Sequence, residues 1–192
     1  MSVNLQKGQK VDLTKGNAGL KRIIIGLGWD EASKLNKGGA IDCDASAILC
    51  GPGEKVYSKD DVVYFGNLRH KNGAVNHQGD NLTGAGDGDD EQITVDLPLI
   101  PANYEKIVFV VNIYKAQERR QHFGLIENAF IRIVDASTNT ELLKYNLSEN
   151  YGGLTAMIFG ELYRHGGEWK FSAIGQGTQD AGIGELAHRY GL

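Results

Sequence analysis

The chain has 192 residues, of which 41% are hydrophobic and 23% charged, values that are ordinary for one globular domain spanning residues 1–192. Its formal net charge is −4, and its basic residues are scattered, which argues against a nucleic-acid partner. No segment approaches ~20 consecutive apolar residues, so we expect no direct membrane insertion, and the polar start of the chain leads us to expect a cytoplasmic protein.

In chain order, short apolar runs recur about every ten residues between glycines, a spacing typical of an all-β sandwich or barrel. The predicted strands are Val3–Lys7, Lys21–Leu27, Ile41–Cys50, Val62–Gly66, Gln92–Leu97, Lys106–Tyr114, Ala129–Asp135, Glu141–Asn146, Leu154–Arg164 and Glu168–Ile174. Two short helices are expected, over Ala116–Phe123 and Ile183–Tyr190. The sequence therefore predicts an all-β, two-sheet β-sandwich with one or two short helices.

Strict alternation supports several of these strands. In Gln92–Leu97 the apolar residues alternate with polar ones, which indicates one buried and one solvated face. Ile107–Val111 is apolar throughout and is expected to form a central strand covered on both sides. The tip of the last predicted hairpin is expected at Gly166 and Gly167.

The segment IDCDASAIL predicts a strand with two different faces. Its apolar side chains point to the core, while Asp42 and Asp44 share the opposite face, ~6.6 Å apart along the strand. Two like charges so placed repel each other unless something neutralises them, and a hard cation between them would do so.

The loop GDNLTGAGDGDDE adds further oxygen atoms. Its candidate metal ligands are the carboxylates of Asp80, Asp87, Asp89, Asp90 and Glu91 and the amide of Asn81, and Asp30 is a further candidate. Ca²⁺ takes about 6–8 oxygen ligands, so this composition favours Ca²⁺, with Mg²⁺ second, and so many acids would suit two ions. The loop is not an EF-hand, because Leu82 and Gly84 replace side-chain ligands and Ala85 replaces the turn glycine.

Three other interpretations stay open on the residues alone. The acidic loop is equally compatible with a simple solvated run of charge. A metal-dependent enzyme acting on a phosphate or oxyanion is a second function class, with His77 as its candidate base. The sequence contains no other recognisable catalytic motif. Direct thiol chemistry through Cys43 and Cys50 is a third, although their separation on one strand argues against a dithiol pair.

The segments IIIGLGWD, IDCDASAILC, GDNLTGAGDGDDEQITVDL, IVFVVNIYKA and FGELYRHGGEWKFSAIGQG, in this order, resemble the TerD family of tellurium-resistance and stress proteins over nearly the whole chain. The resemblance implies a Ca²⁺-binding β-sandwich from bacterial systems of tellurite resistance and of tolerance to phage and colicins. It supplies no reaction, and we expect a binding module and not an enzyme. It implies other proteins of the same resistance system as partners, and it places the metal ligands on the two-aspartate strand and the acidic loop.

Overall fold

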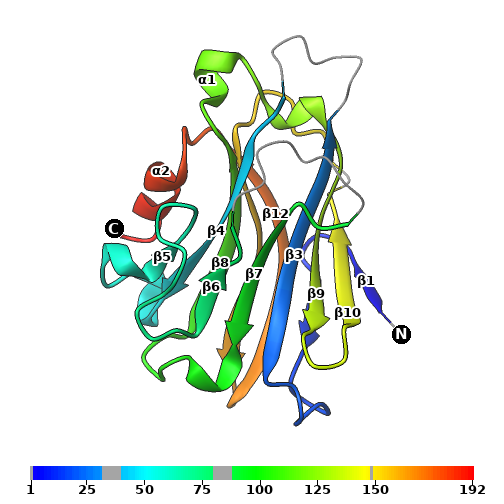
Figure 1. Cartoon of the computed structure of the whole chain (residues 1–192), viewed down its shortest axis with the longest axis vertical. Coiled ribbons are helices and arrows are strands. Elements are labelled where there is room, and N and C mark those ends of the chain that lie inside the picture. The colour runs from blue at the N-terminus through cyan, green and yellow to red at the C-terminus, as the bar shows by residue number, and fades with distance from the viewer. Residues whose placement is uncertain (1, 32–39, 80–87, 148) are drawn as a thin grey trace.

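The computed structural model describes residues 2–31, 40–79, 88–147 and 149–192, and within these ranges the strands form two six-stranded sheets packed face to face (Figure 1). Sheet A contains, in spatial order, β1 (Val3–Leu5), β10 (Thr140–Asn146), β9 (Ile126–Asp135), β3 (Arg22–Glu31), β7 (Glu91–Asp96) and β6 (Val75–His77). Sheet B contains β2 (Lys10–Asp12), β12 (Glu168–Thr178), β11 (Ala156–His165), β8 (Lys106–Ile113), β4 (Cys43–Cys50) and β5 (Val62–Val63). The predicted all-β sandwich is confirmed.

Helices are few in the described part of the chain. The two α-helices are α1 (Ala116–Arg119) and α2 (Ile183–His188), and the single-turn 3₁₀ helices are Pro52–Glu54, Lys59–Asp61, Leu97–Leu99 and Phe123–Leu125. The first α-helix is shorter than expected because Arg120 takes a left-handed backbone conformation, with φ 53°, that ends it. No helix among these is long and apolar enough to cross a membrane.

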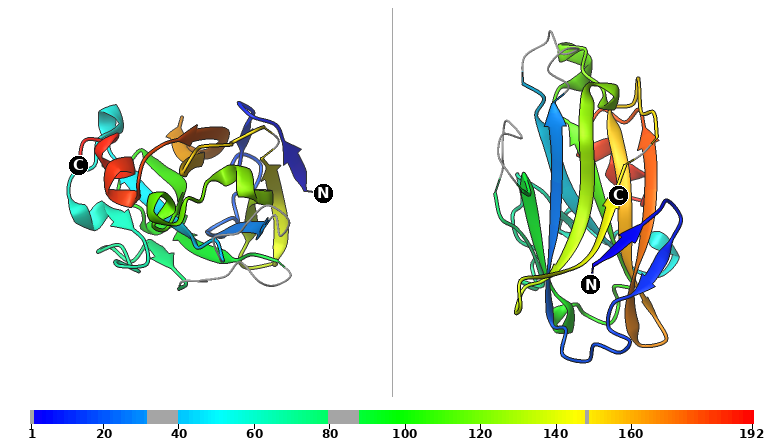
Figure 2. Two further views of the ribbon diagram at one scale, coloured as in Figure 1. Left: turned by 90° about the horizontal axis from the view of Figure 1, so that it is seen from above. Right: turned by 90° about the vertical axis from the view of Figure 1, so that its right-hand side faces the viewer.

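The core lies between the two sheets and follows the predicted alternation. In β7, Ile93 and Val95 are fully buried and the intervening residues are not, while β8 is buried on both sides as expected. One face of β8 fills the space between the sheets, and Val108 and Val110 on the other face pack under α2. Figure 2 shows the two layers from above and from the side, with the N-terminus beside β1 and the C-terminus beside α2.

Several predicted boundaries were wrong for local reasons. The strand expected over Val62–Gly66 ends at Val63, because Tyr64 and Asn67 bond each other's backbone and turn the chain. The strands β2 and β6, three residues each, were missed because so few residues show no periodicity. The hairpin tip at Gly166 and Gly167 is confirmed, and both residues have positive φ.

Candidate metal centre

Three strand ends that carry acidic residues meet at one end of the sandwich, the end that also bears α1 (Figure 1). They are the end of β3, the start of β4 and the start of β7. The register explains why they meet: Leu27 of β3 pairs with Glu91 of β7, and Cys43 of β4 pairs with Ile113 just before α1. Strand pairing in sheet A, together with the packing of β4 against β7, therefore brings Asp30, the Asp42–Asp44 segment and the Asp89–Glu91 segment to the same end of the sandwich.

Glu91 points into the interior rather than toward solvent. In the alternation of β7 it faces the same side as the buried Ile93 and Val95, and it is only 2% exposed. Its Oε2 accepts a hydrogen bond from the backbone N–H of Ala45 on β4, at 2.6 Å. Neighbouring β5 pairs only with Ala47 and Ile48, so the edge of β4 at Ala45 is open, and Glu91 of sheet A caps it.

His77 completes this link between the sheets. Its Nε2 lies 3.1 Å from the carbonyl oxygen of Ala45 and 3.4 Å from Glu91 Oε2, while its Nδ1 accepts a hydrogen bond from Gly79 N–H. Nε2 therefore carries the proton and Nδ1 offers its lone pair, which fixes one tautomer. Both ring nitrogens are engaged within the protein, so in this arrangement His77 has no nitrogen left to take a proton from a substrate.

Asp89 is held on the outer face of sheet A. Its two oxygens accept a bidentate pair of hydrogen bonds from Arg132 of β9, at 2.7 and 3.1 Å, and a third from Gln92. The carboxylate lies over Gly26 of β3, whose strand partners are Gln92 and Arg132. The Asp89 side chain is 1% exposed, so this contact attaches the end of the acidic segment to the sheet.

The surroundings of Asp90 disfavour its charged form. Its Oδ2 accepts a hydrogen bond from Trp29 N–H at 2.7 Å. Burial raises the pKa of the Asp90 carboxyl, and the negative charges of Asp30 and Asp89 raise it further, against the opposing effect of the Trp29 hydrogen bond. Asp30 itself is exposed and accepts a hydrogen bond from Asn128. A cation at this position would relieve the repulsion.

Asp42 and Asp44 lie on the outer face of sheet B, opposite the apolar face of β4, as the sequence predicted. Asp42 lies 3.9 Å from the guanidinium of Arg119, and Asp44 accepts a hydrogen bond of 3.3 Å from the amide of Asn112. The two aspartates are 8% and 4% exposed. Protein groups therefore compensate part of their charge.

The thiol of Cys43 lies amid these acids. Burial raises its pKa well above 9.0, and the charges of Asp44, Glu91, Asp42 and Asp90 raise it further, in that order. These four acids, at or beside the starts of β4 and β7, are all predicted metal ligands. Asp80, Asn81 and Asp87 lie outside the described residues. Among the residues that are described, no three His, Cys, Asp or Glu side chains form a ready metal-holding group.

Among the residues that the structure describes at this end of the sandwich, the candidate donors are carboxylate oxygens, the ligand type that a hard cation takes, and both ring nitrogens of His77 are engaged within the protein. Sequence reasoning missed the side chains that hold the acids in place, namely Arg132, Gln92, Asn112 and Arg119. Arg132 could have been noticed as a lone cation between the core residues Ile131 and Ile133, but its partner lies 43 residues away in the chain.

Fold and site together define a two-sheet β-sandwich protein with an acidic end. Residues 1–190 match the TerD domain, and the chain belongs to the TerD family. It is 52% identical to stress response protein SCP2 of Bacillus subtilis (strain 168), covering 99% of this chain and all of that one. It is 46% identical to tellurium resistance protein TerD of Serratia marcescens, covering 100% and 98%. Among solved structures, the protein of unknown function SAV2460 is similar, with a TM-score of 0.68 at 25% identity, covering 88% and 95%.

Proposed function

We propose that this protein is a cytoplasmic calcium-binding module of a bacterial tellurite-resistance and stress-response system, including tolerance of phage and colicins. The names of its relatives support the biological setting: one is a stress response protein and another a tellurium resistance protein. The observation that carries the calcium assignment is that Glu91 at the start of β7 contacts Ala45 of β4, so that acids of both sheets lie at one end of the sandwich.

The described contacts divide the acids into two groups. Asp30, Asp42, Asp44 and Asp90 are the proposed ligands, because they lie at the end of β3 and at or beside the starts of β4 and β7, which meet at one end of the sandwich. Asp80, Asn81 and Asp87, outside the described residues, would supply the remaining oxygens for two calcium ions. Asp89 and Glu91 are predicted ligands too, but their buried contacts with Arg132 and Ala45 support a role as anchors that attach the end of the acidic segment to the two sheets.

We propose a binding module rather than an enzyme. The metal-dependent enzyme considered as an alternative needs a base close to the metal, and His77 is the candidate. The engagement of both its ring nitrogens by Ala45 and Gly79 weighs against that role. Other proteins of the same resistance system are the proposed partners, through a surface that calcium orders; recovery of the same proteins with and without chelator would contradict this.

Calcium-dependent stability tests the proposal. A ligand at 100 times its Kd stabilises the folded state by about 2.7 kcal/mol, which raises the melting temperature of a chain this long by ~5–10 °C. The variant Asp90→Asn keeps an acceptor for the Trp29 N–H but removes the charge. Because the pKa of Asp90 is raised in the folded protein, the charged form destabilises folding, so this variant should be no less stable than wild type in chelator.

The same variant should lose most of the calcium-induced rise. The matched control is Asp12→Asn, which removes an acid from β2, an edge strand of sheet B, where Asp12 pairs with Lys170 on the surface. This control should show the full rise. An equal response of both variants, or no response of the wild type, would contradict the proposed site.

A further inference from the structure

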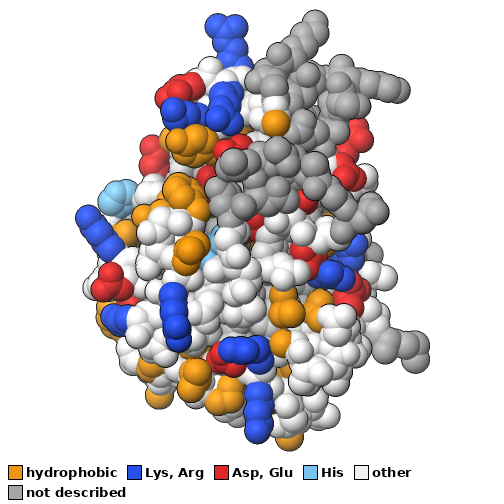
Figure 3. Space-filling view, viewed as in Figure 1, with side chains coloured by type: hydrophobic (Ala, Val, Ile, Leu, Met, Phe, Trp, Pro, Cys, Tyr) orange, Lys and Arg blue, Asp and Glu red, His pale blue; other side chains and the backbone are white. Residues whose placement is uncertain are grey.

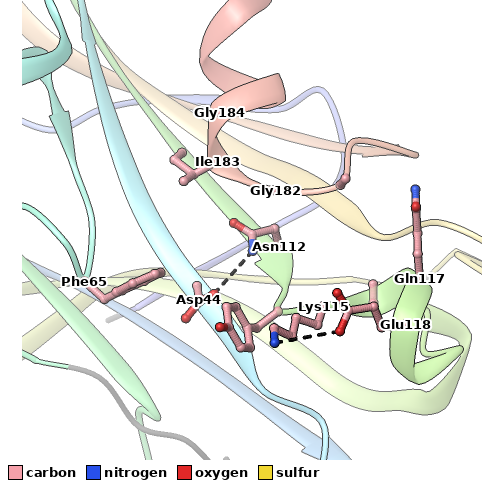
Figure 4. A pocket seen from close by; sticks show the side chains of 12 residues that line it. Asp44, Phe65, Asn112, Lys115, Gln117, Glu118, Gly182, Ile183 and Gly184 are labelled. Carbon is pink, nitrogen blue, oxygen red and sulfur yellow. Dashed lines mark hydrogen bonds and ion pairs between the residues drawn. The ribbon is translucent and has the colours of Figure 1, made fainter.

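A pocket of about 420 Å³ lies at the end of the sandwich opposite α1, beside the β11–β12 hairpin at the bottom of Figure 1. Its lining includes the apolar, largely buried side chains of Leu20, Leu97 and Ile100 and the basic side chain of Arg164 on β11. Figure 3 shows hydrophobic side chains beside Lys and Arg side chains on the surface at this lower end. The pocket in Figure 4 is a different one, and it shares Asp44 with the candidate metal centre.

Arg164 is held in a fixed position in this pocket. It is the cross-strand partner of Trp169 on β12, and its guanidinium lies over the Trp169 ring, 4.3 Å from the ring centroid. Its Nε donates a hydrogen bond to the carbonyl oxygen of Tyr104 at 3.1 Å, and its Nη2 donates to that of Ile100 at 2.7 Å. A guanidinium has five N–H donors, so the other three have no acceptor among the described residues.

Among the described residues, no carboxylate forms an ion pair with the guanidinium of Arg164. Arg22, Arg132 and Arg189 each bind an aspartate, which raises their pKa. Burial instead lowers the pKa of Arg164, and no acid opposes this effect. Removing a cation from water without pairing it with an anion is costly, so a bound anion would recover part of this cost.

Glu168 is the one acid among the described residues that line the pocket. Its carboxylate accepts a hydrogen bond from the hydroxyl of Thr14 and forms no ion pair with Arg164. Successive residues of a strand point to opposite faces, so Glu168 and the neighbouring Trp169, which carries the guanidinium, face different sides of β12. The charge of Glu168 would still repel a second negative charge, so a singly charged carboxylate suits the pocket better than a doubly charged phosphate.

We propose that this pocket binds a carboxylate attached to an apolar group, with Arg164 donating to both carboxylate oxygens and the apolar group lying against Leu20 and Leu97. The planar guanidinium matches a carboxylate in this bidentate arrangement. The carboxylate can come from a free small acid or from the C-terminal residue of a partner protein, which share this chemistry. The proposal is independent of calcium binding, because none of the proposed metal ligands lines this pocket.

The test is an NMR titration of the whole chain at pH 7, in a buffer without other carboxylates or phosphate, that follows the indole N–H signal of Trp169. Hexanoate should produce saturable shifts with a Kd of roughly millimolar order, whereas hexanol, of similar shape without the charge, should not. N-acetyl-leucine distinguishes the two sources: binding as tight as that of hexanoate assigns the pocket to a C-terminal residue, and no binding assigns it to a free acid.

Variants that change the charge of the pocket locate the site. Glu168→Gln removes the acid but keeps an acceptor for Thr14, so it should tighten hexanoate binding severalfold. Ala18→Glu adds an acid at an exposed lining residue and should weaken binding severalfold, whereas Ala181→Glu, at an exposed alanine outside this pocket, should leave it unchanged.

Arg164→Lys keeps the positive charge but loses the planar fork, so it should weaken hexanoate binding about tenfold or more. Because Arg164 also holds two backbone carbonyls, the two glutamate variants, which leave this residue in place, keep the test independent of its role in folding. Absence of saturable hexanoate shifts in the wild type, equal shifts from hexanol, or equal binding by Ala18→Glu and Ala181→Glu would overturn the proposal.

Discussion

Replacing Gly26 by alanine tests how the acidic segment is attached to sheet A. A Cβ at this position would lie 2.2 Å from Asp89 Oδ2 and 2.4 Å from Oδ1, where real Cβ contacts stay beyond 3.0 Å. The Asp89 carboxylate must therefore move, and its bidentate contact with Arg132 at 2.7 and 3.1 Å must break. The substitution is small, but it acts directly on the contact that attaches Asp89 to sheet A.

The expected magnitude follows from the burial of the two partners. Losing hydrogen bonds between charged groups costs about 2–3 kcal/mol here, near the upper end for such bonds because Asp89 is 1% exposed, although Arg132 at 31% stays partly hydrated. Alanine is better than glycine inside a strand by about 0.5–1 kcal/mol. Gly26→Ala should therefore destabilise the fold by about 1–2 kcal/mol, a fall in melting temperature of ~3–8 °C.

The assay is a double-mutant cycle by denaturant or thermal unfolding, in chelator so that calcium does not contribute. Asp89→Ala alone should cost about 2–3 kcal/mol. In that background the clash is absent, so Gly26→Ala should change sign and stabilise the protein by about 0.5 kcal/mol. An equal loss of stability from Gly26→Ala in both backgrounds would refute the placement of Asp89 over β3.

Three further predictions concern buried groups. Burial alone would raise the pKa of Asp61, but hydrogen bonds from a tyrosine, a histidine and two backbone amides hold this pKa below its ordinary 3.8, so the charged carboxylate stabilises the fold above that pH. Asp61→Asn should therefore cost about 2 kcal/mol of unfolding free energy at pH 7. Urea unfolding should show this loss shrinking as the pH falls below 3.8. Glu91→Ala should lower the unfolding free energy by about 2–3 kcal/mol in thermal unfolding with chelator, because the buried N–H of Ala45 loses its acceptor. The control Glu127→Ala, at an exposed residue, should change it by no more than about 0.5 kcal/mol. Equal effects of the two variants would contradict the buried hydrogen bond of Glu91. Burial raises the pKa of Cys43 well above 9.0 and that of Cys50 to about 12. Neither thiol should therefore react with a thiol reagent in the folded protein at pH 8, and both should react in denaturant. Rapid labelling of the native protein would be inconsistent with this.

Most of the strands, and a sandwich as their architecture, were predictable because alternation is a local signal. Ile93 and Val95 in β7, or the wholly apolar β8, identify their own environment within a few residues. The opposite facing of the two cysteines followed from the same rule: Cys43 packs between the sheets and Cys50 under α2. This arrangement excludes a disulfide between them within the straight strand β4 and leaves both thiols free, as expected.

The contacts of the acidic site were not predictable, because they join distant parts of the chain. Glu91 follows the alternation of β7 inward, but its position in a run of acids suggested a loop ligand. Nothing local shows that an N–H of Ala45, 46 residues away, lies uncapped at the edge of another sheet. The same holds for Asp89 and Arg132, whose contact depends on the register of three strands.

The measurement that bears most directly on the proposed calcium site is a calorimetric titration of chelator-stripped protein with Ca²⁺, repeated in millimolar Mg²⁺. We expect saturable binding of two calcium ions that persists in Mg²⁺, because the site offers many protein oxygens and Mg²⁺ retains its water. No binding heat, together with an unchanged melting temperature, would mean that the acidic segment is a solvated run of charge and would contradict the proposed function.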